Sequence, residues 1–182
     1  MGDDNANQRK VCYVGLGSNL GDSEAYLKKA VEALQASDDI HALTISPVYR
    51  SKPHGPQDQP DYLNAVAGFE TSLQPGKLLD LLQKIEAEND RVREGVVRWG
   101  ARTLDLDLLF YGDQIIHTKR LSVPHPQICK RAFVLLPLAD LLGDRCKDLK
   151  TTTKTTIKDC INKLSAQDRA DTLKLTEKHS DL

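Results

Sequence analysis

The stretch that most constrains this chain runs from Arg98 to Gly112 and reads RWGARTLDLDLLFYG. Leucines that alternate with two aspartates, Asp105 and Asp107, predict a β-strand here. Because side chains two residues apart share one face of a strand, both carboxylates point the same way, with Cα atoms about 6.5–7 Å apart. Two like charges this close together are costly unless a cation compensates for them.

Two interpretations of the aspartate pair are open. Carboxylate oxygens are ligands that Mg²⁺ prefers, and this ion takes one or two of them together with substrate phosphates. The pair follows four arginines, Arg91, Arg93, Arg98 and Arg102, whose guanidinium groups can each bind two phosphate oxygens. This combination indicates phosphoryl transfer. In the other interpretation, the aspartates are the solvent-facing positions of a half-exposed strand.

Composition limits the classes of partner. The length of 182 residues favours one domain, and 40% hydrophobic with 28% charged residues is typical of a globular protein in water. A net charge of −1 argues against bulk binding to nucleic acid or to an anionic membrane. With no apolar run of membrane-spanning length and no secretory signal, we expect a cytoplasmic monomer whose partners are small molecules.

The four cysteines are Cys12, Cys129, Cys146 and Cys160. No two of them form a Cys-x-x-Cys pair or show the spacing of a zinc site. We therefore expect four reduced thiols, as in a reducing compartment.

Apolar spacing predicts helices over residues 22–36, 75–89, 131–143 and 155–165, the third of them kinked or begun at Pro137. Strands are predicted over 11–19, 40–53 and 62–73 and at the aspartate pair, with 115–117 as a hairpin partner. The glycines of GLGSNLG predict a tight turn with positive φ. Some neighbouring strands have only a loop between them, which favours a mixed or antiparallel sheet with helices packed on it. We expect one domain over 10–165, with flexible termini at 1–9 and 166–182.

Several motifs occur together in a specific order: GLGSNLGD, SPVYRS, GPQDQPDYLNAV, RWGARTLDLDLLFYG, LSVPHP and RAFVLLPL. In these motifs, which span most of residues 11–142, the chain resembles the 6-hydroxymethyl-7,8-dihydropterin pyrophosphokinase family of folate biosynthesis. The resemblance implies an α+β, ferredoxin-like core with a mainly antiparallel sheet. It also implies an ATP-dependent diphosphotransferase that moves pyrophosphate from ATP to the pterin and releases AMP.

The resemblance further implies two Mg²⁺ ions, with Asp105 and Asp107 as their ligands, and ATP as co-substrate. Arg91 and Arg102 match two catalytic arginines of a mobile loop. The remaining residues that match nucleotide-binding positions are Glu86, Arg93, Arg98, Leu108, Arg120, Ser122, His125 and Arg131. Without the resemblance, Glu86 would be an ordinary exposed helix glutamate and His125 a structural histidine.

For the pterin, the resemblance implies stacking on Tyr62 and Phe133, because a flat aromatic ligand needs rings as well as a few fixed polar partners. The full set of implied substrate residues is Ser51, Lys52, His54, Tyr62, Asn64, Trp99 and Phe133. Lys52 and His54 depart from the family pattern, which has smaller apolar residues at these positions.

Two other functions remain as alternatives. A different two-metal enzyme, such as a nucleotide hydrolase, could use the same aspartates and arginines, and it would act on ATP without any pterin. An RNA-binding module on a similar sheet would need surface aromatics in a signature that this chain lacks. No general base stands out among the residues.

Overall fold

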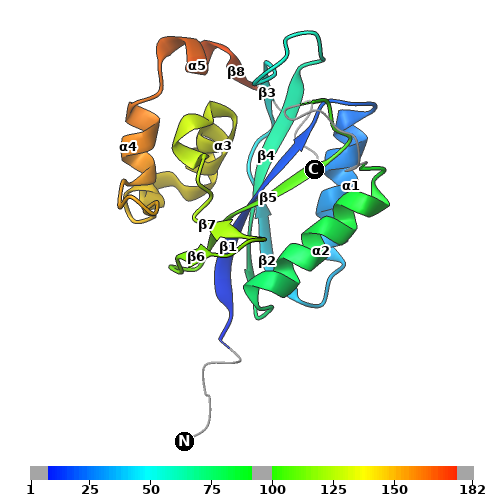
Figure 1. The fold of residues 1–182 in the computed structure, drawn as a ribbon, viewed down its shortest axis with the longest axis vertical. Helices are drawn as coiled ribbons and strands as arrows, with labels where there is room; N and C mark the ends of the chain where they lie inside the picture. Colours follow the sequence, from blue (N-terminus) through cyan, green and yellow to red (C-terminus); the bar gives the residue numbers. More distant parts are fainter. Residues whose placement is uncertain (1–7, 92–99, 176–182) are drawn as a thin grey trace, which may run out of the picture.

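The computed structural model describes residues 8–91 and 100–175, in which a six-stranded antiparallel sheet carries helices on both faces (Figure 1). This confirms the predicted α+β class. The main sheet consists of β1 (Lys10–Ser18), β2 (Ile40–Ile45), β3 (Tyr49–Ser51), β4 (Tyr62–Thr71), β5 (Asp105–Tyr111) and β8 (Thr172–Lys174). The helical elements are α1 (Ser23–Gln35), α2 (Pro75–Glu88), η1 (Ile128–Lys130), α3 (Ala132–Leu142), η2 (Gly143–Lys147), α4 (Ile157–Asn162) and α5 (Ala166–Ala170).

The strand order is β5-β1-β4-β3-β8, and β2 also pairs with β4. β2 and β3 pair with successive parts of the same edge of β4, at Ile40↔Thr71 and at Tyr49↔Asn64. The single strand predicted over 40–53 is therefore interrupted. The interruption falls at Pro47, which has no N–H to donate to a sheet.

Two hydrophobic cores lie on opposite faces of the sheet. The first is packed between the sheet and α1 with α2, and its fully buried side chains include Leu27, Leu34 and Leu78. The second lies under α3 and α4, with Leu135 and Ile157. Figure 1 shows the two helix layers on either side of the strands. Since each helix buries one apolar stripe, the spacing that predicted these helices also set their inner faces.

β5 alternates between the two faces, and this places the aspartates. Leu106 and Leu108 are buried in the first core, whereas Asp105 and Asp107 point to the opposite face and line a common pocket. A bulge follows, because Tyr13 pairs with Phe110 and Val14 with Leu108, which leaves Leu109 unpaired. Both Leu109 and Phe110 then enter the second core. The prediction that the two carboxylates share a face is confirmed.

The helix starts predicted at residues 22 and 75 are confirmed. The side chain of Asp22 accepts a hydrogen bond from the Ala25 N–H (3.0 Å) at the start of α1, and Pro75 occupies the first turn of α2. In contrast, Pro137 lies inside α3, which begins earlier at Ala132. The helix predicted over residues 131–143 is thus confirmed, and of its two alternatives the start at Pro137 is wrong.

Two further expectations differ from the structure. Strand β6 (Ile116–His117) pairs with β7 (Ser122–Val123), and not with β5. Residues 166–174, expected to be part of a flexible terminus, form α5 and β8, and β8 pairs with β3 at Ser51↔Thr172. Residues 1–7, 92–99 and 176–182 lie outside the described residues. No helix within 8–91 or 100–175 has the length and apolar character needed to cross a bilayer.

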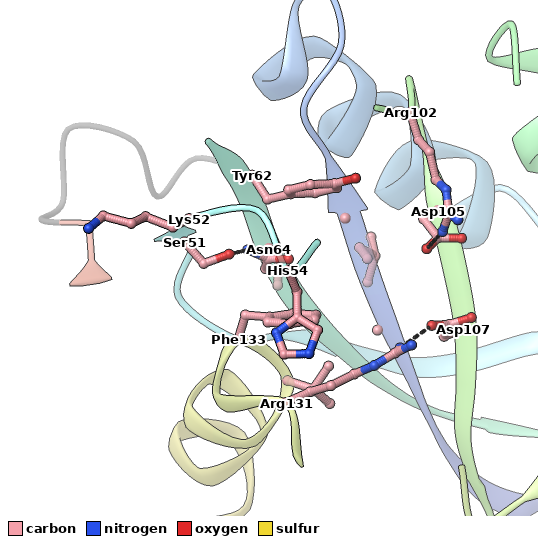
Figure 2. Close-up of a pocket in the computed structure, with 15 residues that line it drawn as sticks. Ser51, Lys52, His54, Tyr62, Asn64, Arg102, Asp105, Asp107, Arg131 and Phe133 are labelled. Atoms are coloured by element: carbon pink, nitrogen blue, oxygen red, sulfur yellow. Dashed lines mark hydrogen bonds and ion pairs between the residues drawn. The ribbon is translucent and has the colours of Figure 1, made fainter. Parts of the chain in front are cut away.

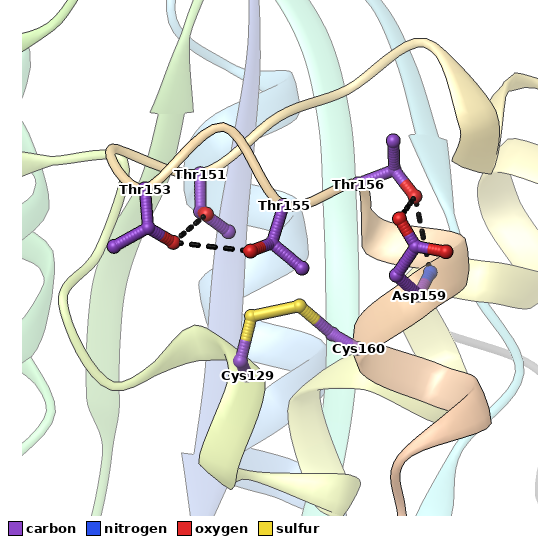
Figure 3. Close-up of a disulfide and its surroundings, with 7 residues drawn as sticks. All are labelled: Cys129, Thr151, Thr153, Thr155, Thr156, Asp159 and Cys160. Carbon is purple, nitrogen blue, oxygen red and sulfur yellow. Dashed lines mark hydrogen bonds between the residues drawn. A yellow bond between two sulfur atoms is a disulfide. The ribbon is translucent and has the colours of Figure 1, made fainter.

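Cys129 and Cys160 form a disulfide between η1 and α4, with Cα atoms 5.0 Å apart (Figure 3). The expectation of four reduced thiols is therefore wrong for this pair. Their sequence separation of 31 carries no motif, and only the packing of α4 beside η1 brings them together. Cys12 and Cys146 are buried free thiols, and burial raises the pKa of Cys12 to about 12.

We expect Cys129→Ser to lower the free energy of unfolding by about 3–4 kcal/mol, because the disulfide closes a loop of this length in the unfolded chain. Urea unfolding followed by circular dichroism measures this change. The same loss should occur in the wild-type chain after full reduction, whereas reductant should leave the variant unchanged. Equal stability of oxidised wild type and variant would contradict the expectation.

Candidate active site

A pocket opens on the face of the sheet that carries Asp105 and Asp107, and it encloses about 650 Å³ including the part open to solvent. Its volume is in the range of small-molecule sites. Figure 2 shows its side chains converging from β1, β3, β4, β5 and the start of α3. Ten residues implied by the resemblance line it: Ser51, Lys52, His54, Tyr62, Asn64, Arg102, Asp105, Asp107, Arg131 and Phe133.

Two glycines of β1 form the floor of this pocket. A Cβ at Gly17 would lie 3.5 Å from Asn64 Oδ1, and one at Gly15 would lie 3.6 Å from Leu109. Larger side chains at these positions would occupy the space that a ligand needs. The predicted turn with positive φ occurs only at Gly21, where φ is 75°. The glycines of the motif thus serve both a turn and a binding surface, and the sequence had indicated the turn alone.

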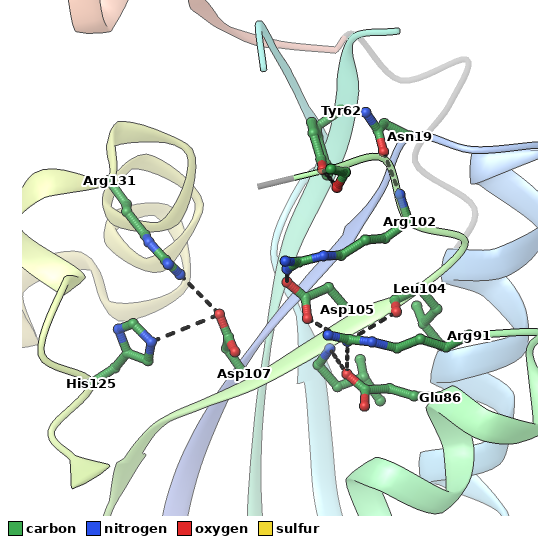
Figure 4. Close-up of polar contacts among 12 residues, drawn as sticks. Asn19, Tyr62, Glu86, Arg91, Arg102, Leu104, Asp105, Asp107, His125 and Arg131 are labelled. Carbon is green, nitrogen blue, oxygen red and sulfur yellow. Dashed lines mark hydrogen bonds and ion pairs between the residues drawn. The ribbon is translucent and has the colours of Figure 1, made fainter. Parts of the chain in front are cut away.

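Asp105 joins Arg102, which lines the pocket, to Arg91, which lies outside its lining (Figure 4). Its Oδ2 accepts a hydrogen bond from Arg102 Nη1 (2.8 Å), and its Oδ1 accepts one from Arg91 Nη1. Burial raises the pKa of Asp105, but the two guanidinium groups outweigh this effect and hold the pKa below its usual range. Asp105 therefore stays charged, and it keeps two guanidinium groups together.

Glu86 supports Arg91 from α2. Glu86 is only 1% exposed, and its Oε1 accepts hydrogen bonds from the Leu106 N–H (2.8 Å) and from Arg91. Arg91 also donates to the Leu104 carbonyl at 3.1 Å. Glu86 thus fixes the start of β5 and the position of Arg91, and it does not line the pocket itself.

Asp107 has its own basic partners. Its Oδ2 accepts a hydrogen bond from Arg131 Nη1 (2.9 Å) and lies 3.9 Å from His125 Nε2. His125 Nδ1 accepts from the Gln127 N–H (3.1 Å), so the ring proton of the neutral histidine is on Nε2, facing Asp107. Burial lowers the pKa of His125, with Arg131 adding to the effect and Asp107 opposing it. This histidine is a neutral donor beside the carboxylate.

The donor set suits a metal ion that is shared with a ligand. Asp105 and Asp107 offer carboxylate oxygens from one face of β5 to the same pocket. Within residues 8–91 and 100–175, no group of three His, Cys, Asp or Glu side chains is placed to hold a metal. Mg²⁺ bound to one or two carboxylates completes its shell with phosphate oxygens and water, which is the arrangement that these residues fit.

The other end of the pocket offers rings and fixed polar groups. Figure 2 shows Tyr62 and Phe133 on opposite sides, with Ser51 and Asn64 between them. Asn64 Nδ2 donates to Ser51 Oγ at 3.0 Å. Tyr62 donates its hydroxyl proton to the Gly100 carbonyl (3.0 Å), and burial raises its pKa. A flat polar heterocycle could stack between the rings and bond to the amide.

The structure gives a reason for one departure from the family pattern. Lys52 directs its Nζ to Asp171 Oδ1 (2.9 Å), and its N–H donates to the Asp171 carbonyl (3.1 Å). The hydrogen bond to Asp171 raises the pKa of Lys52. His54 lies beside Phe133, with ring centroids 6.3 Å apart. Lys52 therefore binds to the C-terminal segment through Asp171, which directly precedes β8.

Several implied residues are not part of the pocket. Leu108 is buried in the first core, on the opposite face of β5. Arg120 is exposed and bonds to Asp80 Oδ1 (2.7 Å), and Ser122 bonds to His117 Nδ1 (2.9 Å). Arg93, Arg98 and Trp99 lie outside the described residues. Asn19 was missed by the sequence interpretation, although its place in GLGSN beside the pocket-floor glycines could have indicated it.

Comparison with known proteins identifies the family. Residues 13–143 match the family of 7,8-dihydro-6-hydroxymethylpterin-pyrophosphokinase (HPPK). The chain is 52% identical over 134 residues to 2-amino-4-hydroxy-6-hydroxymethyldihydropteridine pyrophosphokinase of Haemophilus influenzae, covering 74% of this chain and 82% of that one. It is 48% identical over 132 residues to the enzyme of the same name from Pseudomonas aeruginosa, covering 72% and 80%.

Solved structures agree on the fold. A Plasmodium falciparum HPPK-DHPS chain, crystallised with pterin and p-hydroxybenzoate, superposes with a TM-score of 0.68 at 14% identity. The match covers 92% of this chain and 45% of that one, so this chain spans less than half of the Plasmodium chain. The predicted activity, transfer of pyrophosphate from ATP to 6-hydroxymethyl-7,8-dihydropterin in folate biosynthesis, is confirmed by the family and its named relatives. The chain belongs to the 7,8-dihydro-6-hydroxymethylpterin-pyrophosphokinase family.

Proposed function

We propose that Asp105 and Asp107 would hold two Mg²⁺ ions, and that Arg91 and Arg102 bind the phosphates of ATP during transfer. One observation carries this proposal: both carboxylates lie in one pocket, and each is paired with at least one guanidinium group. Bound Mg²⁺ would neutralise phosphate charge and make the β-phosphorus more electrophilic.

The pairing of the charges supports these roles. Arg91 and Arg102 bond to Asp105, and Arg131 bonds to Asp107. A triphosphate offers oxygens to the guanidinium groups, while the carboxylates gain a metal ion as a new partner. Binding then replaces each internal ion pair by a ligand contact, and no charge is left buried alone. In this proposal, Arg91 and Arg102 stabilise the negative charge that develops in the transition state.

The pterin is proposed to occupy the end of the pocket between Tyr62 and Phe133. Asn64 is held by Ser51 at 3.0 Å, which fixes the direction of its amide for the polar edge of the ligand. The carboxylates of β5 line the same pocket, so a hydroxymethyl group on the pterin can face the phosphates. Placing both substrates in fixed orientation supplies much of the rate enhancement in a reaction of this kind.

We further propose that the chain works as a cytoplasmic monomer on small molecules, without nucleic-acid or membrane partners. The net charge of −1 and the absence of a long basic surface run in the sequence support this. We propose that Arg93 and Arg98 bind the nucleotide and that Trp99 binds the pterin, roles that rest on the family resemblance alone.

A direct assay tests the proposal. The protein is mixed with ATP, Mg²⁺ and 6-hydroxymethyl-7,8-dihydropterin, and nucleotides and pterins are separated by chromatography. We expect AMP and pterin diphosphate in equal amounts, and neither without Mg²⁺. ADP as the product, or phosphate released from ATP without pterin, would contradict the proposal and favour a nucleotide hydrolase.

A further inference from the structure

We propose that Asn19 is a positioning residue that connects the 52–61 loop, which runs from β3 to β4 beside the pterin end, to Arg102 at the phosphate end. The inference rests on the role proposed above for Arg102. Asn19 follows β1 directly and is 2% exposed. Asn19 does not line the pocket, so it would act through its hydrogen bonds to other residues.

On one side, Asn19 holds the backbone of Arg102 (Figure 4). Asn19 Oδ1 accepts from the Arg102 N–H at 2.8 Å, and the Arg102 carbonyl accepts from the N–H groups of Asn19 (3.0 Å) and Leu20 (3.1 Å). From this fixed backbone, the Arg102 guanidinium reaches Asp105 Oδ2 at 2.8 Å. The position of the catalytic arginine therefore depends on the end of β1.

On the other side, Asn19 holds the 52–61 loop. Asn19 Nδ2 donates to Gln59 Oε1 (3.1 Å) and to the Pro60 carbonyl (3.0 Å). The same loop begins with Lys52 and His54 in the pocket wall and ends just before Tyr62. Both amide protons and one lone pair of the carboxamide are thus used, and the partners lie 40, 41 and 83 residues away in sequence.

These contacts couple the two ends of the pocket. The buried side-chain amide of Asn19 keeps all of its hydrogen bonds only when both the 52–61 loop and the Arg102 backbone are in place. A bound pterin that holds the 52–61 loop in this conformation would therefore also favour the position of Arg102 that is proposed to serve pyrophosphate transfer. We infer that Asn19 links occupancy of the pterin end to the readiness of the phosphate end.

Two substitutions of Asn19 separate the two sides. Asn19→Asp keeps the Oδ1 acceptor for the Arg102 N–H, but it replaces the two donors by an oxygen that faces Gln59 Oε1 and the Pro60 carbonyl. We expect the KM for the pterin to rise about tenfold, with kcat within about threefold of wild type. Asn19→Ala removes both sides, so kcat should also fall about tenfold.

A third variant reaches the same link from the loop. Gln59→Ala should raise the KM for the pterin about threefold and leave kcat unchanged. Gln57→Ala is the matched control, because Gln57 bonds to Pro53 and Gly55 within the loop and not to Asn19. The control should keep the wild-type KM within about twofold.

The readouts distinguish this inference from the proposed function. Steady-state kinetics are combined with calorimetric titration of each full-length variant with 6-hydroxymethylpterin, which needs no turnover. Wild-type protein that forms no AMP would contradict the proposed function, whereas the titration would still test the link. Wild-type pterin affinity in both Asn19→Asp and Gln59→Ala would overturn the inference, even if thermal stability fell. An equal rise of KM in Gln57→Ala would overturn it as well.

Discussion

Asp105→Ala and Asp107→Ala are each expected to lower kcat by about 10²–10³-fold while the chain stays folded. Each carboxylate points into the pocket and serves no hydrophobic core, so its loss should remove metal binding and leave packing intact. Asp105→Ala also releases Arg102 from a bond of 2.8 Å, whereas Arg91 keeps its contact with Glu86. AMP formation measured at saturating ATP, Mg²⁺ and pterin gives kcat, and circular dichroism gives the fold.

Asp113→Ala provides the matched control, because Asp113 follows β5 in an exposed turn. This control should keep wild-type turnover. Near-normal kcat in both pocket variants would show that neither carboxylate serves the reaction. A loss of fold in Asp107→Ala would mean that its pair with Arg131 is mainly structural.

Arg102→Ala should lower kcat about 100-fold and raise the KM for ATP much less. The reason is the role proposed for Arg102: a guanidinium group that binds the transferred phosphates would stabilise them most in the transition state, where negative charge develops. Arg102→Lys keeps the charge but loses the planar pair of donors, so it should recover only part of the rate. Initial rates over a range of ATP concentrations separate kcat from KM. A change confined to KM would show that Arg102 binds ground and transition states equally.

The local features of this fold followed from the sequence because they depend on near neighbours. The period-two pattern around Asp105 and Asp107 placed both side chains on one face of β5. Asp22 and Pro75 indicated where α1 and α2 begin, and apolar spacing indicated their inner faces. The pocket residues were assigned by the family motifs, and the structure brings ten of them together.

The remaining features depend on contacts between distant segments. Glu86 resembles any surface glutamate of a helix until α2 packs beside β5 and buries it against Arg91. Cys129 and Cys160 carry no spacing signal, and Asn19 gives no sign in sequence of the partners that it bonds at Gln59 and Arg102. The expectation of a flexible segment at 166–174 is also wrong, because the three residues of β8 extend the sheet by pairing with the distant strand β3.

β8 has a consequence for solubility. By pairing with β3, it occupies hydrogen-bonding groups that would otherwise form an open sheet edge next to Ser51. Open edges recruit strands from other molecules, and short edges that carry lysine resist this. β8 is three residues long and ends in Lys174, so it is a poor template for intermolecular pairing. A chain cut after residue 165 would expose the edge of β3 and should form aggregates, even if its pocket residues keep their positions.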